Sequence, residues 1–140
     1  SIGLSGGSTQ NYILASVNKK VKASVCFFSF ATLRHQFYQY RLCHCLYHFI
    51  PGMIEEGIDW DQVVSLIPPR KIFFGWGRKD EGTPEVMYRS FVNAIEKRCK
   101  EENLPKSVFV YEEKDVGHKI TMRMLKASIE FLKKFLNMEG

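Results

Sequence analysis

Long hydrophobic runs are missing from this 140-residue sequence. No stretch reaches the roughly 18 consecutive apolar residues that a membrane-spanning helix requires. The longest apolar stretch near the start, residues 21–30, contains a lysine and two serines. The charged, apolar and cleavage regions of a secretory signal peptide are not visible either. The sequence therefore predicts no membrane-spanning segment and no membrane partner.

Cysteine is scarce, with four residues in the whole sequence. Cys26 lies within an apolar run and is typical of a small core residue. Cys43 and Cys45 are separated by one residue, a spacing that makes a bridge between them geometrically poor. This pattern favours a reducing compartment such as the cytoplasm, although the sequence does not fix the localisation.

Negative charge is in deficit, which leaves a net charge of +5 and a sequence pI near 9.0. A basic balance raises the possibility of nucleic-acid binding. The lysines are spread along the chain, however, and those near the C-terminus alternate with apolar residues, as on a solvated helix face. No RNP, zinc-finger or helix-turn-helix signature accompanies them, so we expect no nucleic-acid partner.

Three apolar runs rich in β-forming residues predict strands that are buried on both faces. They are "KASVCFFSF" at 22–30, "KIFFGWG" at 71–77 and "SVFVYE" at 107–112. Helical patterns alternate with them, at 8–17, from Pro84 to about Glu101, and after Thr121, which can cap a last helix. That last helix carries a spaced apolar stripe of Leu125, Ile129, Leu132 and Leu136. Strands separated by helices predict an α/β fold with about three parallel strands and flanking helices.

The segment 31–67 differs in kind from the rest of the chain. It is irregular, rich in aromatic residues and too long for a simple connection. Long connections of this type are often lids or binding loops. We therefore expect 31–67 to form an insert within a single domain.

A G-x-S-x-G pattern stands at Gly3, Ser5 and Gly7. This pattern is typical of a sharp strand-to-helix turn that exposes a nucleophilic serine, but alone it is a weak signal. Asp80 follows the second predicted strand and His118 follows the third. Ligands bind at the carboxyl ends of strands in parallel α/β sheets, so all three side chains are expected on one rim. Their chain order, Ser then Asp then His, is that of the α/β hydrolases.

The whole chain resembles the C-terminal half of an α/β-hydrolase fold serine hydrolase, most of all dienelactone-hydrolase-like and acetyl-xylan-esterase-like proteins. The resemblance is carried by "GLSGGS", "FIPGM", "LIPPRKIFFGWGRKD" and "DVGHKITMRMLKASIEFLKKFL". It implies Ser5 as nucleophile, Asp80 as acid and His118 as base. Dienelactone hydrolases carry a cysteine nucleophile, whereas position 5 is serine, which favours ester cleavage over lactone opening. Asp115 and Glu81 are rival acids that the sequence leaves open.

The implied activity is hydrolysis of short-acyl carboxylic esters through an acyl-enzyme, with the backbone N–H of Gly6 as one oxyanion donor. The second donor normally comes from an earlier loop, which this sequence lacks. We therefore expect an N-terminal half or an oligomeric partner to complete the sheet beside residues 23–30. A prolyl-oligopeptidase-like peptidase and a non-catalytic fragment that retains the triad remain alternatives.

We expect the insert to lie over the active site, with Phe37 and Trp60 lining the substrate pocket. A second candidate site is "CHCLYH", which holds Cys43, His44, Cys45 and His48. Its C-x-C-x-x-H spacing differs from that of zinc sites, and no second distant ligand pair accompanies it. The sequence therefore predicts no metal and no cofactor.

Overall fold

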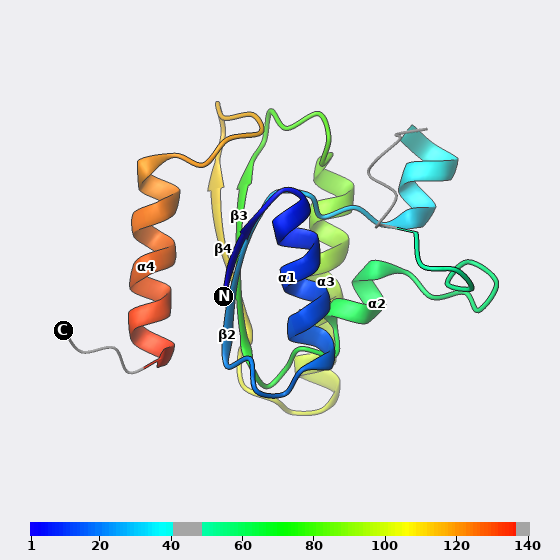
Figure 1. Ribbon diagram of the computed structural model, residues 1–140, viewed down its shortest axis with the longest axis horizontal. Coiled ribbons are helices and arrows are strands. Elements are labelled where there is room, and N and C mark those ends of the chain that lie inside the picture. The colour runs from blue at the N-terminus through cyan, green and yellow to red at the C-terminus, as the bar shows by residue number, and fades with distance from the viewer. Residues whose placement is uncertain (41–48, 137–140) are drawn as a thin grey trace.

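A four-stranded parallel sheet forms the centre of the molecule. The computed structural model describes the backbone of residues 1–40 and 49–136, and the side chains of all of these except 38–40. The strands β1 (Ile2–Leu4), β2 (Ala23–Phe27), β3 (Lys71–Gly77) and β4 (Val108–Glu113) lie side by side in chain order. Every neighbouring pair is parallel (Figure 1). The predicted α/β architecture is confirmed.

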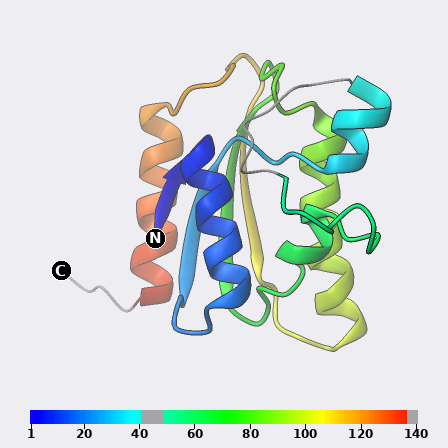
Figure 2. The same ribbon diagram turned by 45° about the vertical axis from the view of Figure 1, so that its right-hand side comes forward.

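Helices cover both faces of this sheet. On one side lie α1 (Gly6–Val17), α2 (Trp60–Val64) and α3 (Glu85–Glu101), and on the other lies α4 (Met122–Leu136). A short π-helix, η1 (His35–Tyr40), stands beyond the first layer, on the side away from α4 (Figures 1 and 2). Within the described residues, no helix is long and apolar enough to span a bilayer.

The side chains of β3 point alternately to the two faces of the sheet, and this alternation explains how the helices on both faces pack against it. Phe74 points to one face, where its ring lies 4.7 Å from that of Phe30 and 6.2 Å from that of Phe91 in α3. Phe73 points to the other face, where its ring lies 5.5 Å from that of Phe131 in α4. Successive side chains of a strand face opposite sides, so an uninterrupted apolar run is what a strand covered on both sides needs.

The buried face of α4 is shifted by one residue from the predicted stripe. Met124, Ser128 and Phe131 are the buried positions of α4, whereas Ile129 is 40% exposed and Leu136 is 37% exposed. Both patterns repeat at helical spacing, and the bulk of Phe131, packed against Phe73, selects the one that faces the sheet. The predicted stripe was therefore wrong in register, although the helix itself was right.

The edge of the sheet also differs from the prediction. Ile2–Leu4 form a strand of their own, paired with Val25–Phe27, so the sheet has four strands and β2 is an interior strand. The expectation that residues 23–30 form the unpaired edge was wrong. A strand of three residues is too short to give a periodicity signal, which is why the sequence pattern did not reveal it.

Candidate active site

Ser5 occupies a strained turn between β1 and α1. Its backbone has φ 53° and ψ −119°, a conformation that non-glycine residues rarely adopt. The turn brings two glycines together, since a Cβ on Gly3 would stand 2.1 Å from the carbonyl oxygen of Gly7. A Cβ on Gly7 would meet nothing within 4 Å. Glycine is thus sterically required at position 3, and the strain at Ser5 marks the turn as a candidate functional site.

Asp80 and His118 meet at the carboxyl ends of β3 and β4. The Asp80 Oδ2 and His118 Nδ1 atoms lie 3.1 Å apart. The Asp80 side chain is only 3% exposed, whereas the imidazole is 43% exposed. The other oxygen of Asp80 accepts a hydrogen bond from the N–H of Gly82 at 3.1 Å. A buried carboxylate with an open-faced imidazole is an arrangement that can orient a general base.

The rival acid Asp115 has a different partner. Its carboxylate is 74% exposed and lies 3.0 Å from the ammonium group of Lys79. Asp115 thus lies in the same loop as His118 but pairs with Lys79, and the hydrogen bond of the imidazole goes to Asp80.

Two contacts connect the serine turn to the histidine. The N–H of Ser5 donates to the carbonyl of Phe27 at 2.9 Å, at the end of β2. The next residue, Phe28, is buried, and its ring centroid lies 4.9 Å from that of His118. Among the described residues no hydrogen bond joins Ser5 to His118. Hydrogen bonds to a catalytic base are often long before substrate binds.

Backbone hydrogen bonds tie the loops of Asp80 and His118 to each other. The N–H of Arg78 donates to the carbonyl of Glu113 at 2.9 Å, and that of Lys79 donates to the carbonyl of Val116 at 2.9 Å. The approach is so close that a Cβ on Gly77 would stand 2.2 Å from the Val116 oxygen. These main-chain contacts hold the Asp80 loop against the His118 loop.

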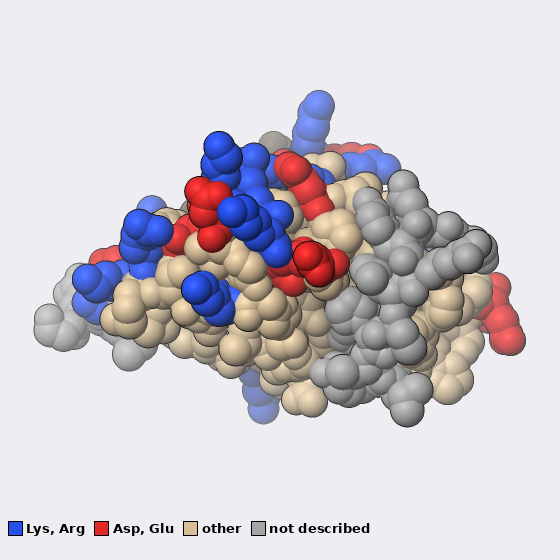
Figure 3. Space-filling view, turned by 90° about the horizontal axis from the view of Figure 1, so that it is seen from above, with Lys and Arg blue, Asp and Glu red and all other residues tan. Residues whose placement is uncertain are grey.

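Charges of both signs mix on the end of the molecule where these loops emerge. Figure 3 looks onto this end and shows Lys and Arg side chains beside Asp and Glu, with no field of one sign. The pairs Lys79–Asp115, Arg78–Glu112 and Arg123–Glu113 account for part of this mixing. On the part of this face that is drawn in colour, basic and acidic side chains thus lie side by side.

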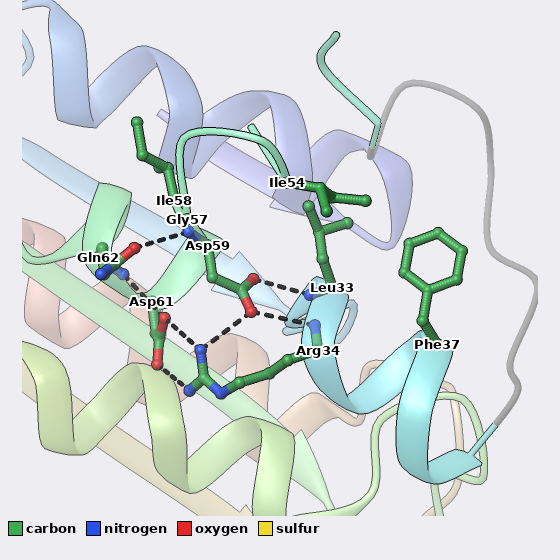
Figure 4. A pocket seen from close by; sticks show the side chains of 9 residues that line it. All are labelled: Leu33, Arg34, Phe37, Ile54, Gly57, Ile58, Asp59, Asp61 and Gln62. Carbon is green, nitrogen blue, oxygen red and sulfur yellow. Dashed lines mark hydrogen bonds and ion pairs between the residues drawn. The ribbon is translucent and has the colours of Figure 1, made fainter. Parts of the chain in front are cut away.

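A pocket of about 330 Å³ lies beside η1, and Figure 4 shows its lining. Its apolar wall is Leu33, Phe37, Ile54 and Ile58, and its polar side holds Arg34, Asp59, Asp61 and Gln62. The Asp59 carboxylate accepts from the N–H groups of Leu33 and Arg34, and the Arg34 guanidinium bridges Asp59 and Asp61. Phe37 therefore lines a pocket, but Ser5, Asp80 and His118 are not among its lining residues.

Trp60 lies elsewhere, in the hydrophobic core. Asp59 caps α2 through a capping box with Gln62, which turns Trp60 inward. The Trp60 ring then packs edge-on against Tyr12 of α1 at 6.0 Å, and the residue is 1% exposed. In this conformation Trp60 has no surface to offer a substrate.

The candidate metal ligands Cys43, His44, Cys45 and His48 lie outside the described residues. Within the part of the chain that is described, no group of three or more His, Cys, Asp or Glu side chains could hold a metal ion. Cys26 and Cys99 are buried free thiols. Burial raises the pKa of the Cys26 thiol to about 12, so it stays protonated and unreactive at neutral pH.

Sequence reasoning missed two features around His118. Phe28 and Ser29 both have φ 62°, and Phe28 packs on the imidazole. No sequence signal marks this, because bulky residues seldom adopt positive φ. The contact of Glu113 with Thr121 was also missed, although a buried glutamate at a strand end is the kind of residue that needs a partner.

Comparison with known proteins identifies the fold. No protein-family model matches the chain, and no curated protein matches it significantly. Solved structures do match. A glucuronoyl esterase from Caldicellulosiruptor kristjansonii superposes with a TM-score of 0.74 at 16% identity, over 99% of this chain and 43% of its own.

Two further matches come from hydrolases of the same fold. One is a protein assigned as a dienelactone hydrolase from Klebsiella pneumoniae, with TM-score 0.62 and 12% identity over 99% of this chain and 51% of its own. The other is acetyl xylan esterase 1 from a Thermoanaerobacterium species, with TM-score 0.60 and 16% identity over 96% of this chain and 44% of its own.

Proposed function

We propose a hydrolase function for this chain, because it has the fold of part of an α/β hydrolase and spans about half the length of the solved hydrolases that it matches. We propose that it carries the catalytic triad of a carboxylic-ester hydrolase, with Ser5 as nucleophile, His118 as base and Asp80 as acid. The observation that carries the proposal is the 3.1 Å contact between buried Asp80 and open-faced His118 after β3 and β4, in a sheet where β2 separates these strands from β1 and the strained Ser5 turn.

The mechanism follows from the needs of the serine hydroxyl, which is a weak nucleophile at its own pKa. Nε2 of His118 accepts the Ser5 proton as Oγ attacks the ester carbonyl, while Asp80 holds Nδ1 and stabilises the imidazolium. The imidazolium then protonates the leaving alcohol, which leaves an acyl-Ser5 intermediate. Water, deprotonated by His118, releases the acid and restores the serine.

The developing oxyanion needs fixed donors. Gly6 opens α1, where the first N–H groups have no partner within the helix, so its N–H is available for this role. The helix start also contributes a favourable dipole. The second donor would come from the part of the fold that the matched structures have in addition.

The proposed substrates are short-acyl esters of small molecules, with the insert at 31–67 over the active site. The resemblance to esterases supports this class, since three matched structures are described as esterases. A prolyl-oligopeptidase-like peptidase shares the serine turn and is the alternative within the fold.

The direct test is hydrolysis of p-nitrophenyl acetate by the 140-residue chain, with Ser5→Ala as control. Labelling by a fluorophosphonate reports the nucleophile separately, because it needs an activated serine but no turnover. Ser5-dependent hydrolysis and labelling support the esterase, while turnover of a peptide substrate alone supports the peptidase. Labelling that is equal in wild type and Ser5→Ala contradicts the assignment of the nucleophile.

We also propose that a further parallel strand, from an N-terminal half or an oligomeric partner, pairs with β1. The Ser1 carbonyl and the Ser5 N–H bond to β2, so the backbone groups of Ile2 and Leu4 face the other way. The two residues are 52% and 44% exposed. Such an apolar open edge is one that native proteins avoid. Sedimentation of the chain tests this, and a monodisperse, cooperatively melting monomer with full activity contradicts it.

A further inference from the structure

The loop that carries His118 is closed at its base by a polar contact outside the triad. The loop leaves β4 at Glu113 and enters α4 just after Thr121. The Thr121 hydroxyl donates to Oε1 of Glu113, and Nη2 of Arg123 donates to Oε2 at 2.7 Å. The Thr121 oxygen in turn accepts the N–H of Met124 at 3.1 Å, which caps α4.

The buried Glu113 carboxylate requires the hydrogen bonds that Thr121 and Arg123 donate to it. The Glu113 side chain is 7% exposed, and a carboxylate with so little access to water needs donors. The bonds from Arg123 and Thr121 hold the pKa of Glu113 below its usual range, so the group is ionised at neutral pH. Both carboxylate oxygens thus accept hydrogen bonds from Thr121 and Arg123, and we call this set of contacts the loop closure.

Val116 anchors the middle of this loop in the hydrophobic core, whereas the base of the loop faces a hollow. A surface hollow of about 490 Å³ borders it, lined by Tyr111, Glu112, Glu113, Lys114, Asp115, Val116 and Arg123. The loop is also held to the Asp80 loop by the Lys79–Val116 hydrogen bond. Between Val116 and the base of the loop stands His118, whose imidazole is 43% exposed.

We propose that Glu113 is a positioning residue for His118, acting through Thr121 and Arg123 to keep the imidazole against Asp80. The inference rests on the proposed function for its catalytic meaning, but the placement of the ring can be measured without activity. Loss of the closure lets the base of the loop move into the hollow. A misplacement of roughly 1 Å in a catalytic group is enough to cost on the order of 10²-fold in rate.

The experiment compares Glu113→Ala and Thr121→Val with two controls. Thr121→Ser keeps the hydroxyl, and Glu112→Gln removes the neighbouring carboxylate, which pairs with Arg78 and Arg89 and not with the loop closure. The readout is the NOE between the rings of His118 and Phe28, whose centroids lie 4.9 Å apart. The His118 resonances are assigned with a His118→Gln variant, and folding is checked by the amide spectrum.

In Glu113→Ala and Thr121→Val the NOE is expected to fall about threefold for a displacement of roughly 1 Å, the scale that impairs catalysis. Thr121→Ser and Glu112→Gln should keep the wild-type intensity. Where esterase activity is present, kcat falls in the first pair with KM little changed. The proposal is overturned if Thr121→Val or Glu113→Ala folds and keeps the wild-type NOE. If Glu113→Ala does not fold, the NOE of Thr121→Val alone tests the proposal.

Failure of the proposed function has a different signature. A chain without Ser5-dependent hydrolysis or labelling, but with the expected NOE losses, keeps the positioning role of Glu113 and removes only its catalytic meaning. A chain with Ser5-dependent activity that is unchanged in both Glu113→Ala and Thr121→Val removes the positioning role and keeps the esterase.

Discussion

Adding one methyl group at Gly77 should separate the two loops that carry Asp80 and His118. The new Cβ would stand 2.2 Å from the carbonyl oxygen of Val116 and 2.8 Å from its carbon. To reach ordinary contact distance, the two backbones must move apart by roughly 1 Å. That movement breaks the 2.9 Å hydrogen bond from Lys79 to Val116.

The magnitude follows from two costs. Overpacking against backbone costs about 1–3 kcal/mol, and the lost hydrogen bond costs about 1 kcal/mol more. We therefore expect Gly77→Ala to lower the free energy of unfolding by about 2–4 kcal/mol in urea titration. Esterase activity, where present, should fall on the order of 10²-fold because His118 leaves its position beside Asp80.

Gly117→Ala is the matched control from the same contact. Its Cβ would lie 3.4 Å from the Lys79 oxygen, an ordinary contact. The expected change in stability is within about 1 kcal/mol, and it can be an increase, because alanine restricts the unfolded chain. The reasoning is refuted if Gly77→Ala unfolds at the same urea concentration as wild type, or if both variants lose equal stability.

Three further substitutions or reactions test other parts of the structure. Gly3→Ala should lose about 2–4 kcal/mol of stability in the same urea titration, because its Cβ overlaps the Gly7 carbonyl. The control Gly7→Ala should lose about 1 kcal/mol or less. Equal losses in the two variants contradict the tight turn. Asp59→Ala should cost about 2–4 kcal/mol, because it removes a helix cap and the carboxylate that accepts from the N–H groups of Leu33 and Arg34. A loss below that of an exposed ion-pair variant such as Lys97→Ala argues against it. Cys26, with its pKa raised to about 12 by burial, should resist alkylation at pH 8 until the chain unfolds, as read by mass spectrometry of the labelled peptides.

The positions that sequence reasoning placed well are those where a strand ends. Asp80 and His118 were predicted on one rim because each follows an apolar run, and the carboxyl ends of parallel strands share an edge. The structure brings them into contact, with Asp80 buried. The spacing of the motif could not show which glycine is sterically needed, since Gly3 and Gly7 look alike in the sequence.

The positions that could not be predicted depend on contacts far apart in the chain. Trp60 looked like a pocket residue because aromatic residues crowd the insert, yet the cap at Asp59 turns it toward Tyr12 in the core. The face of α4 was ambiguous by one residue until Phe73 supplied the ring that Phe131 packs against. Both outcomes need the partner surface, which local periodicity does not contain.

The two sides of the candidate site are held to different degrees by this chain. Asp80 and His118 follow interior strand β3 and the six-residue edge strand β4, which pair along the whole of β4, with the Arg78 N–H bonded to the Glu113 carbonyl. Ser5 follows β1, a three-residue edge strand that pairs with β2 alone and exposes Ile2 and Leu4.

Edge strands with few buried contacts open locally at low free energy, whereas interior strands open only with the whole domain. Native-state hydrogen exchange should therefore find the Ser5 amide far less protected than the Arg78 amide, even though both donate at 2.9 Å. Pairing of β1 with a further strand should raise the protection of Ser5 selectively and leave that of Arg78 unchanged. Equal protection of the two amides in the isolated chain would mean that β1 needs no neighbour, and the proposal of a strand beyond it would fall.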